Sequence, residues 1–160
     1  MPATHRVSVE RNRLRFAAAH MATYHGDLEP LHGHNYDVMV EIEGELTEDA
    51  WVWDFGDLKR QTKGIIDALD HRFILQRDGR LIDIEETPES WVVRFRDRRY
   101  VFPRADVVAL PIDNSTAERL AEWIAGRLVE HYRPLAQGFR KVTVGVEESP
   151  GQAGWYTVET

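Results

Sequence analysis

The chain contains no cysteine. It therefore has no disulfide framework, no thiolate zinc ligand and no thiolate nucleophile, and any metal site must use other donors. Long hydrophobic runs are also missing, since no apolar stretch approaches the ~20 residues that span a bilayer. The first ten residues, MPATHRVSVE, lack the apolar core of a signal peptide. We therefore expect a cytoplasmic protein that does not bind a membrane.

Positive charge is scarce. The 160 residues carry 20 lysines and arginines against 27 aspartates and glutamates, which leaves a net charge of −7. Nucleic-acid binding relies on clustered positive charge, so nucleic acid is not an expected partner. The length suits one domain with a hydrophobic core, and no repeat or linker interrupts it. The sequence thus predicts a single domain over residues 1–160.

Strand periodicity is the clearest pattern. Residues 5–20 and 32–44 alternate, and the tail shows two further strands, at 141–149 and 154–159. Segments on either side of Asp97 predict a hairpin. Alternation places these residues on one face of their strands: Leu14, Phe16, Ala18 and His20 in the first, and His32, His34, Tyr36, Val38, Val40 and Ile42 in the second.

Two segments have helical spacing. Residues 54–71 begin at Asp54, a good N-cap, and residues 114–132 begin near a capping box formed by Ser115 and Glu118. Mostly antiparallel strands with helices on one face define an α+β domain.

Three histidines lie at the ends of the first two strands. His32 and His34 point to one face, and His20 ends the strand that precedes them. A hairpin would bring the three imidazoles together, and neutral imidazoles are good zinc ligands. His25, in the middle of the loop, is an alternative ligand. The alternative without a metal is that these histidines are polar residues hydrogen-bonded locally.

Several carboxylates are candidates for proton transfer or ligand binding. Asp27 and Glu29 lie in the loop before His32, and either can accept a proton from a substrate beside a metal. Pro30 stiffens the chain after Glu29, which favours that residue. Asp70 could orient His71. Spacing alone favours a simpler explanation, in which His71 is a polar residue that interacts favourably with the C-terminus of the helix.

Glu148 lies on the apolar face of the strand at 141–149. It either reaches water at the end of the strand or accepts the parallel N–H groups of a guanidine-like edge such as that of a pterin. Five arginines crowd the hairpin, where a solvated surface is a better explanation than a polyphosphate site. They are Arg94, Arg96, Arg98, Arg99 and Arg104.

Six stretches together resemble the 6-pyruvoyltetrahydropterin synthase / 6-carboxytetrahydropterin synthase family: FAAAH, LHGHNY, DFGDLK, ALDHR, NSTAERLA and VEESPGQAGWY. They follow the family's order across nearly the whole chain. The resemblance implies the tunnelling fold (T-fold), an antiparallel four-stranded sheet with two helices on one face, here with an extra hairpin between about Gln76 and Leu110. It also implies a homohexamer of two stacked trimers, with active sites between subunits.

The resemblance implies roles as well. His20, His32 and His34 match the ligands of Zn²⁺. Asp70 and His71 match a proton-transfer pair that a neighbouring subunit contributes. Glu148 matches the carboxylate that anchors the pterin, and Thr116 the threonine beside it.

Most members of the family place a catalytic cysteine before LHGH, and this chain has none. It resembles the subgroup in which a glutamate takes that role, and Glu29 fits. Members of that subgroup convert 7,8-dihydroneopterin triphosphate to 6-hydroxymethyl-7,8-dihydropterin, a folate precursor, so we expect a zinc-dependent lyase of this type. The alternatives are 6-carboxy-5,6,7,8-tetrahydropterin synthase, towards queuosine-type deazapurines, and a catalytically silent zinc- and pterin-binding module.

Overall fold

The computed structural model describes residues 3–135 and 138–160, except the side chains of 11–13. A six-stranded sheet in the order β11-β10-β4-β1-β5-β9 forms its centre. Four long strands are antiparallel, as predicted: β1 (His5–His20), β4 (His32–Gly44), β10 (Phe139–Ser149) and β11 (Gln152–Glu159). Two short strands, β5 (Arg72–Gln76) and β9 (Val107–Leu110), extend the sheet in parallel. The sheet is therefore mixed, because crossover connections rather than tight turns lead into these two strands.

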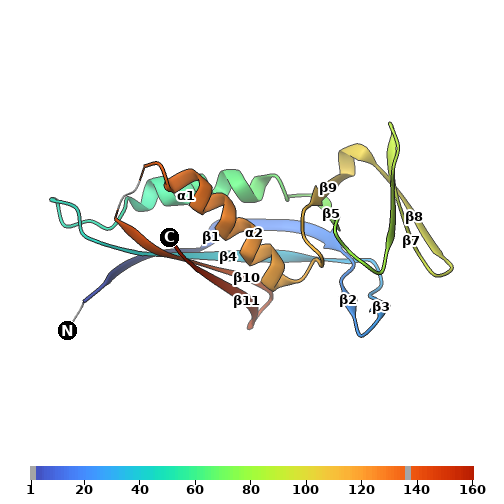
Figure 1. Ribbon diagram of the computed structural model, residues 1–160, viewed down its shortest axis with the longest axis horizontal. Helices are drawn as coiled ribbons and strands as arrows, with labels where there is room; N and C mark the ends of the chain where they lie inside the picture. Colours follow the sequence, from blue (N-terminus) through green and yellow to red (C-terminus); the bar gives the residue numbers. More distant parts are fainter. Residues whose placement is uncertain (1–2, 136–137) are drawn as a thin grey trace.

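Helices α1 (Phe55–Asp67) and α2 (Ala117–Tyr132) cover one face of the long strands (Figure 1). The apolar members of the predicted inward rows of β1, β4 and β10 are buried beneath them, so the alternation in the sequence identifies the core correctly, while His32, His34 and Glu148 in the same rows are partly exposed. Neither helix, in the part of the chain described, is long and apolar enough to cross a membrane. The α+β class and the T-fold arrangement are both confirmed by this architecture.

The start of α1 agrees with the prediction, and the start of α2 differs by one residue. The Asp54 carboxylate caps α1 by accepting from the Asp57 N–H at 2.7 Å. In α2 the cap is Thr116, which accepts from Arg119, and not Ser115. Ser115 is fully buried before the helix begins.

Helix α1 ends at Asp67, although helical spacing predicts it through residue 71. The chain leaves the helix because it bonds to the edge of β1. The His71 N–H donates to the Ala17 carbonyl at 2.6 Å, and the Ala17 N–H donates to Asp70 Oδ1 at 2.8 Å. His71 adopts a φ of 57°, which a helix does not allow.

The segment between β5 and β9 forms a small three-stranded sheet beside the main one (Figure 1). It consists of β6 (Asp83–Glu86), β7 (Ser90–Phe95) and β8 (Arg98–Pro103), followed by a 3₁₀ turn at Arg104–Asp106. The predicted hairpin around Asp97 is confirmed, and β6 adds a strand to it. Between β1 and β4, the chain forms a two-stranded ribbon, β2 (Thr23–Tyr24) and β3 (Asp27–Leu28). We call residues 21–29 the connecting loop.

Candidate metal centre and proton-transfer groups

The three histidines meet where β1 ends and β4 begins. Cα pairing in the antiparallel ladder sets His20 opposite His32 and Ala18 opposite His34. Their rings lie edge to face, with centroids 4.7 to 5.2 Å apart. The row of imidazoles predicted from strand alternation is therefore present.

Backbone carbonyls orient two of these rings. His20 Nδ1 lies 2.8 Å from the Ser115 carbonyl, and His32 Nδ1 lies 2.7 Å from the Pro30 carbonyl. A carbonyl only accepts, so each Nδ1 carries the proton and each Nε2 presents a lone pair. Burial lowers the pKa of His20, which keeps that imidazole in the neutral form that binds metals.

The Nε2 atoms of His20 and His32 are 3.2 Å apart. Two lone pairs that face each other repel unless a cation lies between them. Two ligands bound tetrahedrally to zinc at ~2.05 Å are separated by ~3.3 Å, which is close to this spacing. The two imidazoles are thus arranged as ligands rather than as partners of each other.

Glu148 and His34 complete the cluster. Glu148 Oε1 lies 2.6 Å from His34 Nε2 and 3.4 Å from His20 Nε2. The His34 Nε2 atom is buried, and its contact with Glu148 lacks hydrogen-bond geometry. One ligand atom from each of the four residues lies within 4.8 Å of the others. Three neutral imidazoles are a donor set that suits zinc and leaves a fourth position open, so the residues present fit the metal.

The connecting loop places its two carboxylates differently. Glu29 Oε2 is 3.9 Å from His32 Nε2 and accepts from the Ala22 N–H at 3.2 Å. Asp27 Oδ1 instead lies 3.4 Å from Arg96 of the small sheet. His25 is exposed at the tip of the loop, where its ring packs on Tyr24. Of these loop residues, Glu29 is the one that the structure brings to the histidines.

Asp70 and His71 form a pair away from this cluster. Asp70 Oδ2 lies 2.9 Å from His71 Nδ1, and the side chain of His71 is 82% exposed. Donation from the Ala17 backbone holds the pKa of Asp70 below its usual range. His71 lines a groove with Ala17 and Asn35, whose side chains alternate with those of the buried rows. The lining of this groove also includes His34, so within one chain the pair borders the strand that carries two of the histidines.

Thr116 acts in this structure as the cap of α2, directly after the Ser115 carbonyl that holds His20. Sequence reasoning did not identify Ser115 as a residue of the site. It read Ser115 as a helix cap, and only the tertiary contact between the segment before α2 and the end of β1 shows this role. Asn114 was missed as well; its side chain both accepts from the N–H and donates to the carbonyl of Thr23, in the connecting loop.

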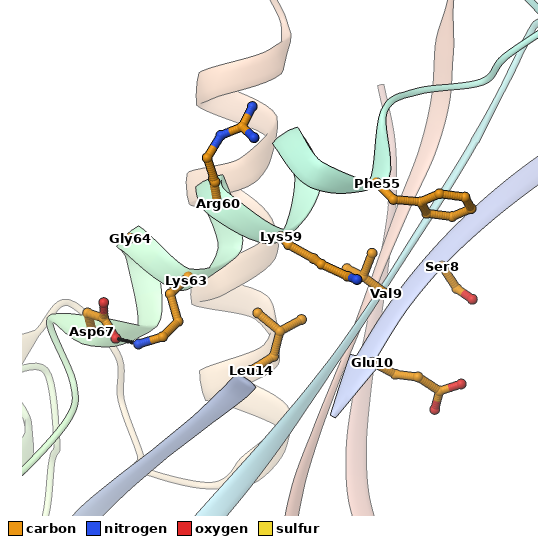
Figure 2. Close-up of a pocket in the computed structure, with 10 residues that line it drawn as sticks. All are labelled: Ser8, Val9, Glu10, Leu14, Phe55, Lys59, Arg60, Lys63, Gly64 and Asp67. Carbon is orange, nitrogen blue, oxygen red and sulfur yellow. Dashed lines mark hydrogen bonds and ion pairs between the residues drawn. The ribbon is translucent and has the colours of Figure 1, made fainter. Parts of the chain in front are cut away.

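A large groove of the described surface lies elsewhere. A groove of about 1320 Å³ runs between the outer edge of β1 and α1, and none of its lining residues belongs to the histidine cluster (Figure 2). Phe55 is half exposed at its rim, while Lys59 and Lys63 project from α1 (Figure 2).

Comparisons with known proteins agree with this arrangement. The 6-pyruvoyl tetrahydropterin synthase of Plasmodium vivax has a structure that superposes with a TM-score of 0.94 at 30% identity, covering 99% of this chain and 100% of that one. A structure of a variant of that protein replaces a glutamate, described as a catalytic residue, with alanine. The 6-carboxy-5,6,7,8-tetrahydropterin synthase of Haemophilus influenzae is 32% identical over 119 residues, 71% of this chain and 76% of its own.

A Methanocaldococcus jannaschii protein, named provisionally for the same 6-carboxy activity, is 33% identical over 147 residues and covers 89% of both chains. The family model described as 6-pyruvoyl tetrahydropterin synthase matches residues 8–159. These matches show that the chain belongs to the 6-pyruvoyl tetrahydropterin synthase family.

Proposed function

We propose that this chain is a zinc-dependent lyase that acts on the side chain of 7,8-dihydroneopterin triphosphate. The observation that carries the proposal is the pair of Nε2 atoms of His20 and His32, 3.2 Å apart, with each Nδ1 occupied by a carbonyl. His34 would be the third ligand. Zinc supplies positive charge that lowers the pKa of hydroxyl groups on a substrate. The other steps fall to side chains of the protein.

Glu29 is the proposed proton carrier. Its carboxylate lies 3.9 Å from His32 and is 43% exposed, so it borders both the metal ligands and the space that a substrate would enter. The N–H of Ala22 holds one carboxylate oxygen. The glutamate called catalytic in the Plasmodium vivax protein supports a carboxylate in this role.

Glu148 and Thr116 are the proposed contacts of the pterin ring. A carboxylate that accepts two parallel N–H bonds recognises a 2-amino-pyrimidinone edge. Glu148 occupies the end of β10, beside the histidines.

The Asp70–His71 pair is proposed as a second proton-transfer group, supplied by a neighbouring subunit. Within one chain, neither residue of the pair belongs to the group of donor atoms formed by the three histidines and Glu148. Two unpaired edges, of β11 and of most of β1, terminate the antiparallel part of the sheet. Joining these edges between copies would close a barrel, and the groove beside β1 offers apolar surface at Phe55 for that contact. We therefore propose that three copies join edge to edge into a closed trimer, and that two trimers stack into a homohexamer.

The product is proposed on the names of the relatives. Those from Haemophilus influenzae and Methanocaldococcus jannaschii make 6-carboxy-5,6,7,8-tetrahydropterin the leading candidate. This reverses the order inferred from the sequence, which ranked that product second.

A second candidate product is 6-hydroxymethyl-7,8-dihydropterin. It is favoured by the absence of cysteine and by the carboxylate of Glu29 beside His32. In this retro-aldol reaction a base takes the C2′ hydroxyl proton, and the C1′–C2′ bond breaks as C2′ becomes the carbonyl of an aldehyde that leaves with the triphosphate. The pterin ring accepts the electron pair and returns it as C1′ takes up a proton, which gives the hydroxymethyl group.

Incubation of the zinc-loaded protein with the triphosphate, followed by mass spectrometry of the pterins, tests the proposal. A 6-carboxy product supports the leading candidate, and a 6-hydroxymethyl product supports the second. If zinc and pterin bind but no product forms, the chain is a silent binding module and the proposal of an enzyme is wrong.

A further inference from the structure

The small sheet β6-β7-β8 packs against the connecting loop that carries Glu29. Met21 and Leu28, near the two ends of the loop, are buried in a hydrophobic cluster with Trp91, Val93 and Phe95 of β7. This cluster is separate from the main core beneath the helices. The loop is thus packed against the small sheet, in a cluster that also includes Phe73 and Leu75 of β5.

Two arginines at the tip of the β7–β8 hairpin bond to the backbone of the loop. Arg98 Nη2 donates to the Leu28 carbonyl at 2.8 Å, and Arg96 Nη2 donates to the Gly26 carbonyl at 3.2 Å. Both guanidinium groups also approach Asp27 Oδ1, Arg96 at 3.4 Å and Arg98 at 3.8 Å. A charged donor to a carbonyl makes a stronger hydrogen bond than a neutral one.

Arg98 is the better placed of the two. Its carbonyl partner belongs to Leu28, which directly precedes Glu29. Both guanidinium carbons lie near the Phe95 ring, at 5.0 Å for Arg98 and 4.7 Å for Arg96, but the side chain of Arg98 is 31% exposed against 65% for Arg96. Packing on the ring limits the positions that the guanidinium can take.

The far side of the loop is held as well. Gln76 Nε2 donates to the Met21 carbonyl at 2.7 Å in a buried contact. The Glu29 N–H donates to the Ala22 carbonyl at 2.9 Å, so the two ends of the loop are bonded to each other. Because hydrogen bonds hold both ends of the connecting loop, a shift of the Leu28 backbone would move the Glu29 carboxylate relative to His32.

We propose that the small sheet is a brace that positions Glu29, with Arg98 as the positioning residue. This inference rests on the proposed function, in which Glu29 carries the proton. Arg98 does not touch the histidines; it acts by fixing the Leu28 carbonyl and, through the chain, the carboxylate one residue later. In a protein with this brace, the loop is ordered before substrate binds.

Three variants of the full-length zinc-loaded protein test the brace. Arg98→Met removes the donor and retains the apolar stem, and Arg98→Lys restores a single charged donor. Arg99→Met is the matched control, because Arg99 is the next residue of β8 and is exposed. We expect Arg98→Met to raise amide hydrogen exchange in residues 22–29 by about tenfold or more, without a change in residues 34–44.

In kinetics, we expect Arg98→Met to lower kcat by about 10- to 100-fold, with KM within about threefold and zinc content unchanged. Arg98→Lys should recover part of kcat, and Arg99→Met should match the wild type. Wild-type exchange in residues 22–29 of Arg98→Met would overturn the brace, as would exchange that rises equally throughout the main sheet. If Arg98→Met does not fold, amide exchange in residues 22–29 and kcat are compared between Arg98→Lys and Arg99→Met instead.

The exchange measurement separates this inference from the proposed function. If the wild type forms no pterin product, the proposed function fails, while exchange still reports whether Arg98 orders the loop. If Arg98→Met loosens the loop and kcat does not change, the loop is braced but its position has no catalytic role, and the inference is wrong.

Discussion

Replacing Glu29 separates catalysis from stability, because its carboxylate has one structural contact and one proposed chemical role. Glu29→Gln keeps an oxygen that accepts from Ala22 and cannot act as a base at neutral pH. Glu29→Ala removes both functions. Asp27→Asn tests the other carboxylate of the loop, which lies beside Arg96 rather than the histidines.

The structure sets the size of each effect. The bond from Ala22 to Glu29 is 3.2 Å long and the side chain is 43% exposed, so Glu29→Ala should cost about 1 kcal/mol of unfolding free energy. For a chain of this length, that lowers Tm by ~2–4 °C. A positioned general base contributes ~10²–10⁴-fold, so both Glu29 variants should lose at least about 100-fold in kcat.

Steady-state turnover, thermal denaturation and elemental analysis of the same preparations provide the assay. Both Glu29 variants should retain zinc, and Glu29→Gln should keep the wild-type Tm. Asp27→Asn should stay within a few-fold of wild-type kcat, because exposed ion pairs contribute little. Full activity in Glu29→Ala would refute the reasoning and show that this carboxylate is not the proton carrier.

Three further changes follow from the fold. Gly33→Ala brings a Cβ to 2.9 Å from the Ala18 carbonyl, so it should lower stability by about 1–3 kcal/mol and weaken zinc binding, as measured by denaturation and zinc titration. The pKa of Asp70 is lowered in the folded state, so its stabilisation is complete above the unfolded value of ~3.9 and is lost as pH falls through the folded value. The Tm difference between wild type and Asp70→Asn should therefore be constant near neutral pH and disappear in acid; a difference that persists in acid would contradict this. Phe55→Glu should shift the sedimentation profile toward smaller species, and an unchanged profile would exclude this groove from the interface.

Much of the site follows from alternation in the sequence. A period of two residues places His32 and His34 on the buried side of β4, and the hairpin connection brings His20 opposite them. The T-fold was also predicted, through motifs whose order matches the family. These features are local or repeat along the chain, which is why the sequence reveals them.

The remaining features depend on contacts between distant segments. The role of Ser115 follows from how the segment before α2 meets the end of β1, over a separation of 95 residues from His20. The interpretation of the hairpin arginines as solvated surface misses Arg98, whose partner Leu28 lies 70 residues away. Periodicity and capping rules carry no information about which carbonyl such a donor reaches.

The account depends most on the metal. Elemental analysis of protein purified without chelators, repeated after saturation with zinc, measures it directly, with His25→Ala as the control for His32→Ala. We expect about one zinc per chain in the wild type and in His25→Ala, and little in His32→Ala. Wild-type protein that holds no zinc after saturation, and whose Tm does not change on adding zinc, would contradict the account.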